Sequence, residues 1–153
     1  MTDIKLLAKQ FRESIDTVRN AGEFDKDFSF YNFPRGCCGD ACDLLAHFLL
    51  DNGIRTFYVC GTYNDGSFDN IQSHAWLLTE NQTIIDITGD QFRNNPIFLN
   101  YNTPVYVGAG DDFHRLFEVE DRNIHRSTRL DELGSMCQPR LFELYEKIIK
   151  HLK

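Results

Sequence analysis

The chain has 153 residues and a globular composition, with 42% hydrophobic and 13% aromatic residues. This length fits one domain and can bury a sizeable core, so we predict a single domain over residues 1–153. The formal net charge is −7, from 23 acidic and 16 basic residues. An acidic balance argues against nucleic acid or an anionic membrane as the main partner, because both favour a basic surface.

The N-terminal residues and the cysteines indicate the compartment. The opening sequence MTDIKLLAKQF mixes charges with apolar residues and does not follow the pattern of a signal peptide. The sequence contains no run of the roughly 20 apolar residues that span a bilayer. Five cysteines, three of them within residues 37–42, make a poor disulfide framework. We therefore expect free thiols and a cytoplasmic protein.

The first third of the chain predicts two helices. Apolar residues recur at helical spacing over residues 3–20, and Ala-Gly follows as a stop signal. Residues 23–37 are rich in Phe and contain Pro and Gly, which favours an irregular connection. A second amphipathic helix is expected from Cys38 to the residues before Gly53, a typical C-terminal cap.

The remaining sequence predicts strands and a last helix. The strand candidates are residues 54–63, 74–79, 83–88, 105–107 and 115–119. The short connection at 80–82 predicts a hairpin between the second and third candidates. Residues 120–137 show no clear pattern, and Pro139 opens a last amphipathic helix. Together these elements predict an α+β fold.

A candidate nucleophile lies where the irregular connection turns into the second helix, in Gly36-Cys37-Cys38-Gly39-Asp40-Ala41. The positive end of a helix dipole favours the thiolate, which is the nucleophilic form of cysteine. Backbone N–H groups at the same helix end can also stabilise the oxyanion of a tetrahedral intermediate. Cys38 is the candidate nucleophile, and Cys37 competes for the role.

A candidate base and a candidate orienting carboxylate follow in the predicted hairpin. His74 begins one strand, and Asp86 lies twelve residues later in the other. If Thr79 pairs with Thr83, Asp86 and His74 lie diagonal to each other on one face of the hairpin. A carboxylate there would orient the imidazole and stabilise its protonated form. The sequence therefore predicts a triad of Cys38, His74 and Asp86.

These motifs, in this order, resemble the transglutaminase-like core of the papain-like cysteine peptidase superfamily. The similarity covers residues 34–90: Gly-x-Cys, a helix reaching Gly-Ile fifteen residues after the cysteine, Tyr-Val-x-Gly, His-Ala-Trp and Asp-x-Thr. The fifteen-residue step favours Cys38 over Cys37. The resemblance implies a papain/transglutaminase-like fold, with a nucleophile helix packed on an antiparallel sheet. Ile87 departs from the Pro of the usual Asp-Pro-Thr.

The resemblance also implies a reaction and further site residues. It predicts acyl transfer on an amide or thioester, as a hydrolase, deamidase or transamidase, with a protein, a peptide or a small amide as substrate. This chemistry requires no metal or organic cofactor. The family's oxyanion side chain six residues before the nucleophile corresponds to Asn32. Gln91 is a second candidate polar contact.

Two alternatives remain open at the level of sequence. The first is an inactive relative that keeps the fold as a binding or interaction module. The second is a zinc protein with ligands from Cys37, Cys38, Cys42 and His74, although adjacent cysteines fit one tetrahedral ion poorly.

Other polar residues are interpreted as structural or solvated. These are His47 (expected to be partly exposed), His114, His125, His151 and the Asp111-Asp112 pair. Trp76 is expected to pack next to His74, on the same face of its strand.

Overall fold

The computed structural model describes residues 3–66, 71–134 and 136–152. Within these residues the protein is α+β, with three α-helices and one antiparallel sheet of five strands. The helices are α1 (Ile4–Asn20), α2 (Cys38–Asp51) and α3 (Gln138–Lys150). The strands are β1 (Thr56–Tyr63), β2 (Gln72–Thr79), β3 (Ile84–Asp86), β4 (Tyr106–Gly108) and β5 (Ile124–Arg126). They follow the order β4-β3-β2-β1-β5 in the sheet.

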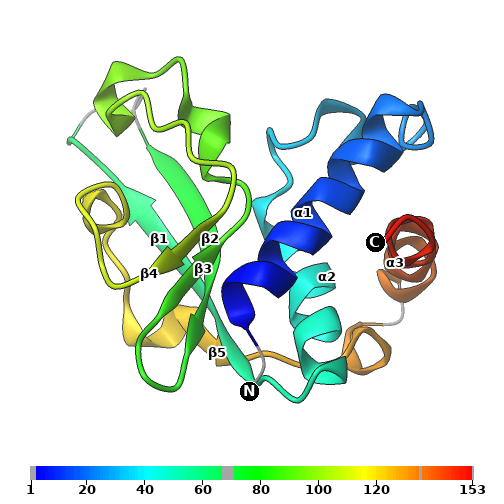
Figure 1. The fold of residues 1–153 in the computed structure, drawn as a ribbon. Helices are drawn as coiled ribbons and strands as arrows, with labels where there is room; N and C mark the ends of the chain where they lie inside the picture. The colour runs from blue at the N-terminus through cyan, green and yellow to red at the C-terminus, as the bar shows by residue number, and fades with distance from the viewer. Residues whose placement is uncertain (1–2, 67–70, 135, 153) are drawn as a thin grey trace.

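The three helices lie on one side of the sheet. Figure 1 shows α1 and α2 next to the sheet and α3 beyond them. Their apolar stripes bury side chains that we call the helical core, together with residues from the sheet. This core includes Ala8, Phe11, Ile15, Val18, Ala41, Leu44, Leu45, Leu49, Ala75, Leu77, Ile85, Leu141, Leu144 and Ile148. Burial of each large apolar side chain stabilises the fold by about 1.5–3 kcal/mol.

The helix ends follow local sequence signals. The Asp3 carboxylate caps α1 by accepting a hydrogen bond from the Leu6 N–H at 3.2 Å. Gly53 follows α2 with a φ of +79°, a left-handed conformation that favours glycine and ends the helix. Pro139 lies in the first turn of α3, where its missing N–H leaves no helical bond unmade. Among the helices in the described ranges, none combines the length and apolar character needed to cross a membrane.

The predicted hairpin is confirmed, with the predicted register. The Thr79 N–H donates to the Thr83 carbonyl at 2.9 Å, and β2 and β3 pair antiparallel from that turn. Side chains alternate between the two faces of a strand, so this register brings Asp86 to the same face as His74. The sheet therefore supplies two of the three predicted site residues from adjacent strands.

The opposite face of the sheet carries a second hydrophobic cluster, which we call the aromatic cluster. Its buried members are Val59, Trp76, Ile84, Phe92, Phe98, Phe113 and Phe117. Its four phenylalanines come from the irregular segment between β3 and β5, which contains short 3₁₀ turns. These turns are Gly89–Phe92, Pro96–Phe98, His114–Leu116 and Asp121–Asn123. Among the described residues, the aromatic cluster is thus covered by short turns and loops and by no α-helix.

One prediction about this irregular region is wrong, and one strand in it was not predicted. The expected strand over 115–119 is instead the turn His114–Leu116, followed by a single β-bridge between Glu118 and Thr62. A strand that the pattern did not indicate, β5, lies within 120–137. Its three residues are all exposed, so they lack the alternation of buried and exposed side chains by which a strand is predicted.

Candidate active site

The chain positions the two adjacent cysteines differently at the start of α2. Cys37 is fully buried, and its thiol donates to the carbonyl oxygens of Ser29 (3.2 Å) and Arg35 (3.3 Å). Burial raises the pKa of Cys37 to about 11, which disfavours the thiolate. Cys38 is half-buried and begins the helix. These environments agree with the prediction that Cys38, not Cys37, is the nucleophile.

The Cys38 thiol interacts with the strand that carries His74. Burial by itself would raise its pKa, but hydrogen bonding to the His74 side chain, the charge of His74 and the Ala75 backbone amide together lower it. The helix dipole acts in the same direction, because Cys38 is the first residue of α2. Cys38 is therefore a partly accessible thiol in surroundings that stabilise the thiolate.

His74 is held by a hydrogen bond to Asp86. The side chain is completely buried, and its Nε2 lies 2.8 Å from Asp86 Oδ2. Burial would lower the pKa of His74, but the charge and hydrogen bond of Asp86, together with Cys38, raise it to about 9. Since Nε2 is bound to Asp86, Nδ1 is the ring nitrogen left to exchange a proton with Cys38. Nδ1 also lies 3.3 Å from Gln91 Nε2, so Gln91, a candidate polar contact from the sequence, contacts the imidazole of His74.

Asp86 is 1% exposed and has hydrogen-bond donors at both of its oxygens. Oδ1 accepts the Thr88 N–H at 2.9 Å, while Oδ2 lies near both His74 and a second histidine, His114. Although burial opposes ionisation, the charge of His74 and the hydrogen bonds from both histidines hold the pKa of Asp86 well below its usual range. A buried carboxylate with these partners stays ionised and orients both rings.

His114 is the site residue that the sequence interpretation missed. It was expected to be structural or solvated, but it is buried, with Nε2 2.7 Å from Asp86 Oδ2. Its Nδ1 lies 2.6 Å from Asp111 Oδ1, so Asp111 is also not a simple solvated charge. His114 lies 28 residues beyond Asp86 in a 3₁₀ turn, and no motif or spacing links the two. The signal that existed was the Asp111-x-x-His114 spacing, which allows a local contact in one turn.

Aromatic rings surround the buried His74–Asp86 pair. The His74 ring centroid lies 5.1 Å from Phe92, 5.5 Å from Phe117 and 5.7 Å from Trp76. The predicted packing of Trp76 next to His74 is confirmed. These rings exclude water, and the lower local dielectric strengthens the interaction between imidazole and carboxylate.

The remaining predicted polar residues have different outcomes. Asn32 is exposed on a 3₁₀ turn, and within the described residues its side chain makes no hydrogen bond to the triad; its oxyanion role stays a prediction. His47 is buried, not partly exposed as expected, because its Nδ1 accepts the Leu130 N–H at 3.0 Å. His151 pairs with Glu23 at 2.8 Å, in agreement with a structural role.

The three residues His74, Asp86 and His114 form the one cluster of possible metal ligands in the described ranges. The two N–O separations of 2.7 and 2.8 Å are those of hydrogen bonds. Ligands about 2.0–2.2 Å from a tetrahedral zinc ion would lie roughly 3.3 Å from each other. The distances therefore fit one carboxylate that is hydrogen-bonded to two histidines better than they fit a zinc centre. The cysteine-based zinc site considered from the sequence does not assemble among the described residues.

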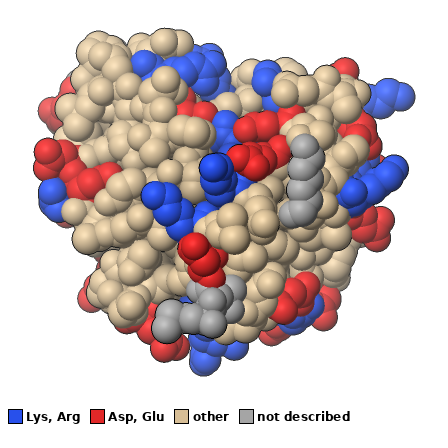
Figure 2. All heavy atoms as spheres, in the orientation of Figure 1, with Lys and Arg blue, Asp and Glu red and all other residues tan. Residues whose placement is uncertain are grey.

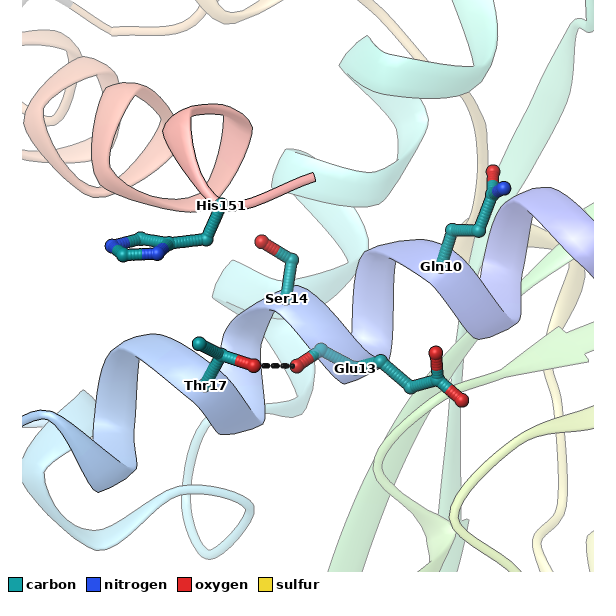
Figure 3. A pocket seen from close by; sticks show the side chains of 5 residues that line it. All are labelled: Gln10, Glu13, Ser14, Thr17 and His151. Atoms are coloured by element: carbon teal, nitrogen blue, oxygen red, sulfur yellow. Dashed lines mark hydrogen bonds between the residues drawn. The ribbon is translucent and has the colours of Figure 1, made fainter. Parts of the chain in front are cut away.

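One hollow away from the candidate site lacks this chemistry. A small cavity of about 50 Å³ lies between α1 and the end of α3, and Figure 3 shows that His151 faces α1 there. Both hydroxyls that line it are already used as donors, that of Ser14 to the Ile148 carbonyl and that of Thr17 to the Glu13 carbonyl. Figure 2 shows Lys and Arg side chains interspersed with Asp and Glu over the face seen in Figure 1.

Comparisons with known proteins return no match. No family model, no curated protein and no solved structure is similar enough to this chain to be reported.

Proposed function

We propose that this chain is a cysteine-nucleophile acyl-transfer enzyme of the transglutaminase-like, papain-like type, with Cys38, His74 and Asp86 as its triad. The observation that carries the proposal is the 2.8 Å bond from His74 Nε2 to Asp86 Oδ2, which leaves Nδ1 for Cys38. The opposite pKa shifts of the Cys38 thiol and the His74 imidazole support it, because they favour a thiolate–imidazolium pair.

The proposed reaction uses this pair in two steps. His74 Nδ1 takes the thiol proton, and the Cys38 thiolate attacks the carbonyl carbon of an amide or thioester. The tetrahedral intermediate collapses to a thioester on Cys38, and the leaving amine or thiol receives the proton from His74. Water or an amine then attacks this thioester while His74 accepts its proton, and the free thiol of Cys38 is regenerated.

The beginning of α2 would stabilise the oxyanion. The N–H groups of the first helical turn have no partners within the helix, and the dipole favours negative charge there. These donors are close to the nucleophile because Cys38 is itself the first helical residue. The Asn32 side chain is proposed as an additional donor, which it would supply by turning toward the substrate.

His114 and Asp111 extend the triad in this proposal as positioning residues. His114 shares Asp86 Oδ2 with His74, and Asp111 holds the far side of the His114 ring. A carboxylate held from two sides cannot rotate away from His74, so the base keeps the orientation that leaves Nδ1 facing Cys38.

The proposal includes a reducing compartment and a soluble acyl donor. All five cysteines are free, with Cys137 exposed, which favours the cytoplasm. A protein, a peptide or a small amide remains the proposed donor class.

The pH dependence of iodoacetamide labelling tests the proposed function. Labelling is read at each cysteine by peptide mass spectrometry, with exposed Cys137 as the internal reference. We expect Cys38 to react faster than Cys137 below about pH 8, the range in which an ordinary thiol of pKa about 8.5 is mostly protonated. His74→Ala should remove this advantage, and circular dichroism should confirm that the variant is folded.

The opposite result would favour the binding-module alternative. If Cys38 in the folded wild-type protein reacts no faster than Cys137 across this range, the thiolate–imidazolium pair does not exist. The chain would then use the same fold without nucleophilic chemistry.

A further inference from the structure

A polar cavity of about 320 Å³ opens beside the candidate triad. Its lining residues come from the loop before α2, the start of β2 and the turn after β3. They are Arg35, Gln72, Gln91, Phe92, Asn94 and Asn95. Among the residues that the structure describes, the lining thus contains four carboxamides and one guanidinium and no carboxylate.

The cavity is directly connected to the proposed base. Gln91, one of its walls, places Nε2 3.3 Å from His74 Nδ1, the nitrogen assigned to proton exchange with Cys38. A second bond of 3.1 Å, from Gln91 Nε2 to the Thr88 carbonyl, fixes this amide in place. Arg35 is three residues before Cys38 in the chain. A ligand in this cavity would therefore lie next to the reacting groups.

Arg35 is the charged group among the described residues that line the cavity. Within the described residues, no carboxylate lies within ion-pair distance of its guanidinium. Five other arginines each have a carboxylate partner, and the remaining arginines have no ion pair among the described residues; the paired ones are Arg12, Arg115, Arg122, Arg129 and Arg140. The Arg35 backbone is held on both sides, because its N–H donates to the Asn32 carbonyl (2.9 Å) and its carbonyl accepts the Cys37 thiol.

The cavity presents this cation on a chain with a net charge of −7. The protein as a whole repels anions, whereas this cavity presents the exposed guanidinium of Arg35 beside neutral carboxamide groups. A guanidinium binds a carboxylate through two parallel hydrogen bonds, and carboxamide N–H groups can satisfy the remaining lone pairs.

We propose that this cavity binds a carboxylate of the substrate, so that the acyl donor is an anionic amide or thioester with a carboxylate close to its reacting carbonyl. This class includes peptides cleaved near their C-terminal carboxylate and amides of small dicarboxylic compounds. The inference rests on the proposed function, which supplies the reaction, and adds the group that Arg35 recognises. Arg35 acts here as a specificity residue that binds substrate and takes no part in proton transfer.

Binding of two matched ligands tests the proposal without requiring catalysis. N-acetylglycine and N-acetylglycinamide each contain an amide and differ in one group, a carboxylate against a carboxamide. Titrations are followed by NMR, through the side-chain N–H signals of Arg35, Gln72, Asn94 and Asn95. We expect saturable shifts of these signals and about tenfold tighter binding of N-acetylglycine, the scale of one charge-assisted hydrogen bond.

Two variants that each remove one positive charge test whether the preference for N-acetylglycine depends on Arg35. Arg35→Gln should make the two ligands bind equally weakly, whereas Arg19→Gln should preserve the preference, because Arg19 is exposed on α1 and does not line the cavity. Equal binding of both ligands to the wild-type protein would overturn the proposal. So would a preference that survives Arg35→Gln, or tighter binding of inorganic phosphate than of N-acetylglycine.

The failure of this proposal is distinguishable from that of the proposed function. If Cys38 is activated but N-acetylglycine has no advantage, the carboxylate site is wrong and the acyl-transfer proposal stands. If N-acetylglycine binds through Arg35 while Cys38 reacts as an ordinary thiol, the cavity is a carboxylate site on a protein without this catalysis.

Discussion

The two sides of the sheet are built in different ways. On one side, α1, α2 and α3 bury mostly aliphatic side chains through regular apolar stripes. On the other, short 3₁₀ turns between β3 and β5 bury four phenylalanines against Trp76. The candidate nucleophile belongs to the first side, because Cys38 begins α2. The candidate base belongs to the second, because His74 packs among the aromatic rings.

This difference separates two tasks of the candidate site. The helical core fixes the axis of α2 and with it the place of the thiol and the oxyanion donors. The aromatic cluster excludes water from the His74–Asp86 pair and brings in His114. Damage to either side should lower stability, but only damage to the aromatic cluster should also change the titration of the imidazole.

Truncation of one large side chain on each side of the sheet is expected to have the largest effect on stability, and it tests whether the two sides have different tasks. Phe113→Ala should lower the free energy of unfolding by about 3–5 kcal/mol and Leu144→Ala by about 2–5 kcal/mol. Urea unfolding measures both. The variants should differ in the pH profile of Cys38 labelling, which Phe113→Ala should shift because its ring lies 5.7 Å from the His74 ring, whereas Leu144→Ala should not. A shift of equal size in both variants would contradict the separation of tasks.

Removal of His114 is expected to have the next largest effect. His114→Ala leaves Asp86 without one buried donor, so Cys38 labelling at pH 6 should slow by about 10- to 100-fold. His114→Gln, which can still donate through its side-chain amide, should recover part of the rate. If both variants label Cys38 at the wild-type rate, His114 is a packing residue and the extended triad is wrong.

The stability of the protein should depend on pH through His74. Its pKa is raised from 6.5 to about 9 on folding, so the stabilisation is complete below about pH 6.5 and is lost as pH rises through about 9. Thermal unfolding of wild type should therefore show a falling melting temperature between pH 7 and pH 9.5. In the folded His74→Gln variant, this decrease in melting temperature should be smaller. If the decrease is as steep as in wild type, groups other than His74 cause it.

The smallest expected effect is that of removing the N-terminal cap of α1. Asp3→Ala removes the cap of α1 and should cost about 1 kcal/mol in urea unfolding. The Cys38 labelling profile should stay the same, because this cap is remote in the chain from the nucleophile helix. Asp3→Asn, which retains a capping oxygen, is the matched control and should cost little. A changed labelling profile in Asp3→Ala would mean that α1 positions the site directly.

The sequence by itself determined the three helices and the β2–β3 hairpin. Amphipathic spacing predicted α1, α2 and α3, and Gly53 and Pro139 marked their ends, because these signals act between residues within one or two turns. The hairpin register, and with it the bond between His74 and Asp86, followed from the short connection at 80–82. Local interactions decide such features, so local patterns predict them.

Only the tertiary structure decided what gathers around that pair. Outside β4, the segment between β3 and β5 forms only short 3₁₀ turns and loops, so the sequence did not indicate which face its buried phenylalanines would cover. His114, the cavity at Arg35 and strand β5 depend on contacts between residues far apart in the chain. The physical reason is that an irregular segment is shaped by the surface on which it packs, and no single stretch of sequence contains that surface.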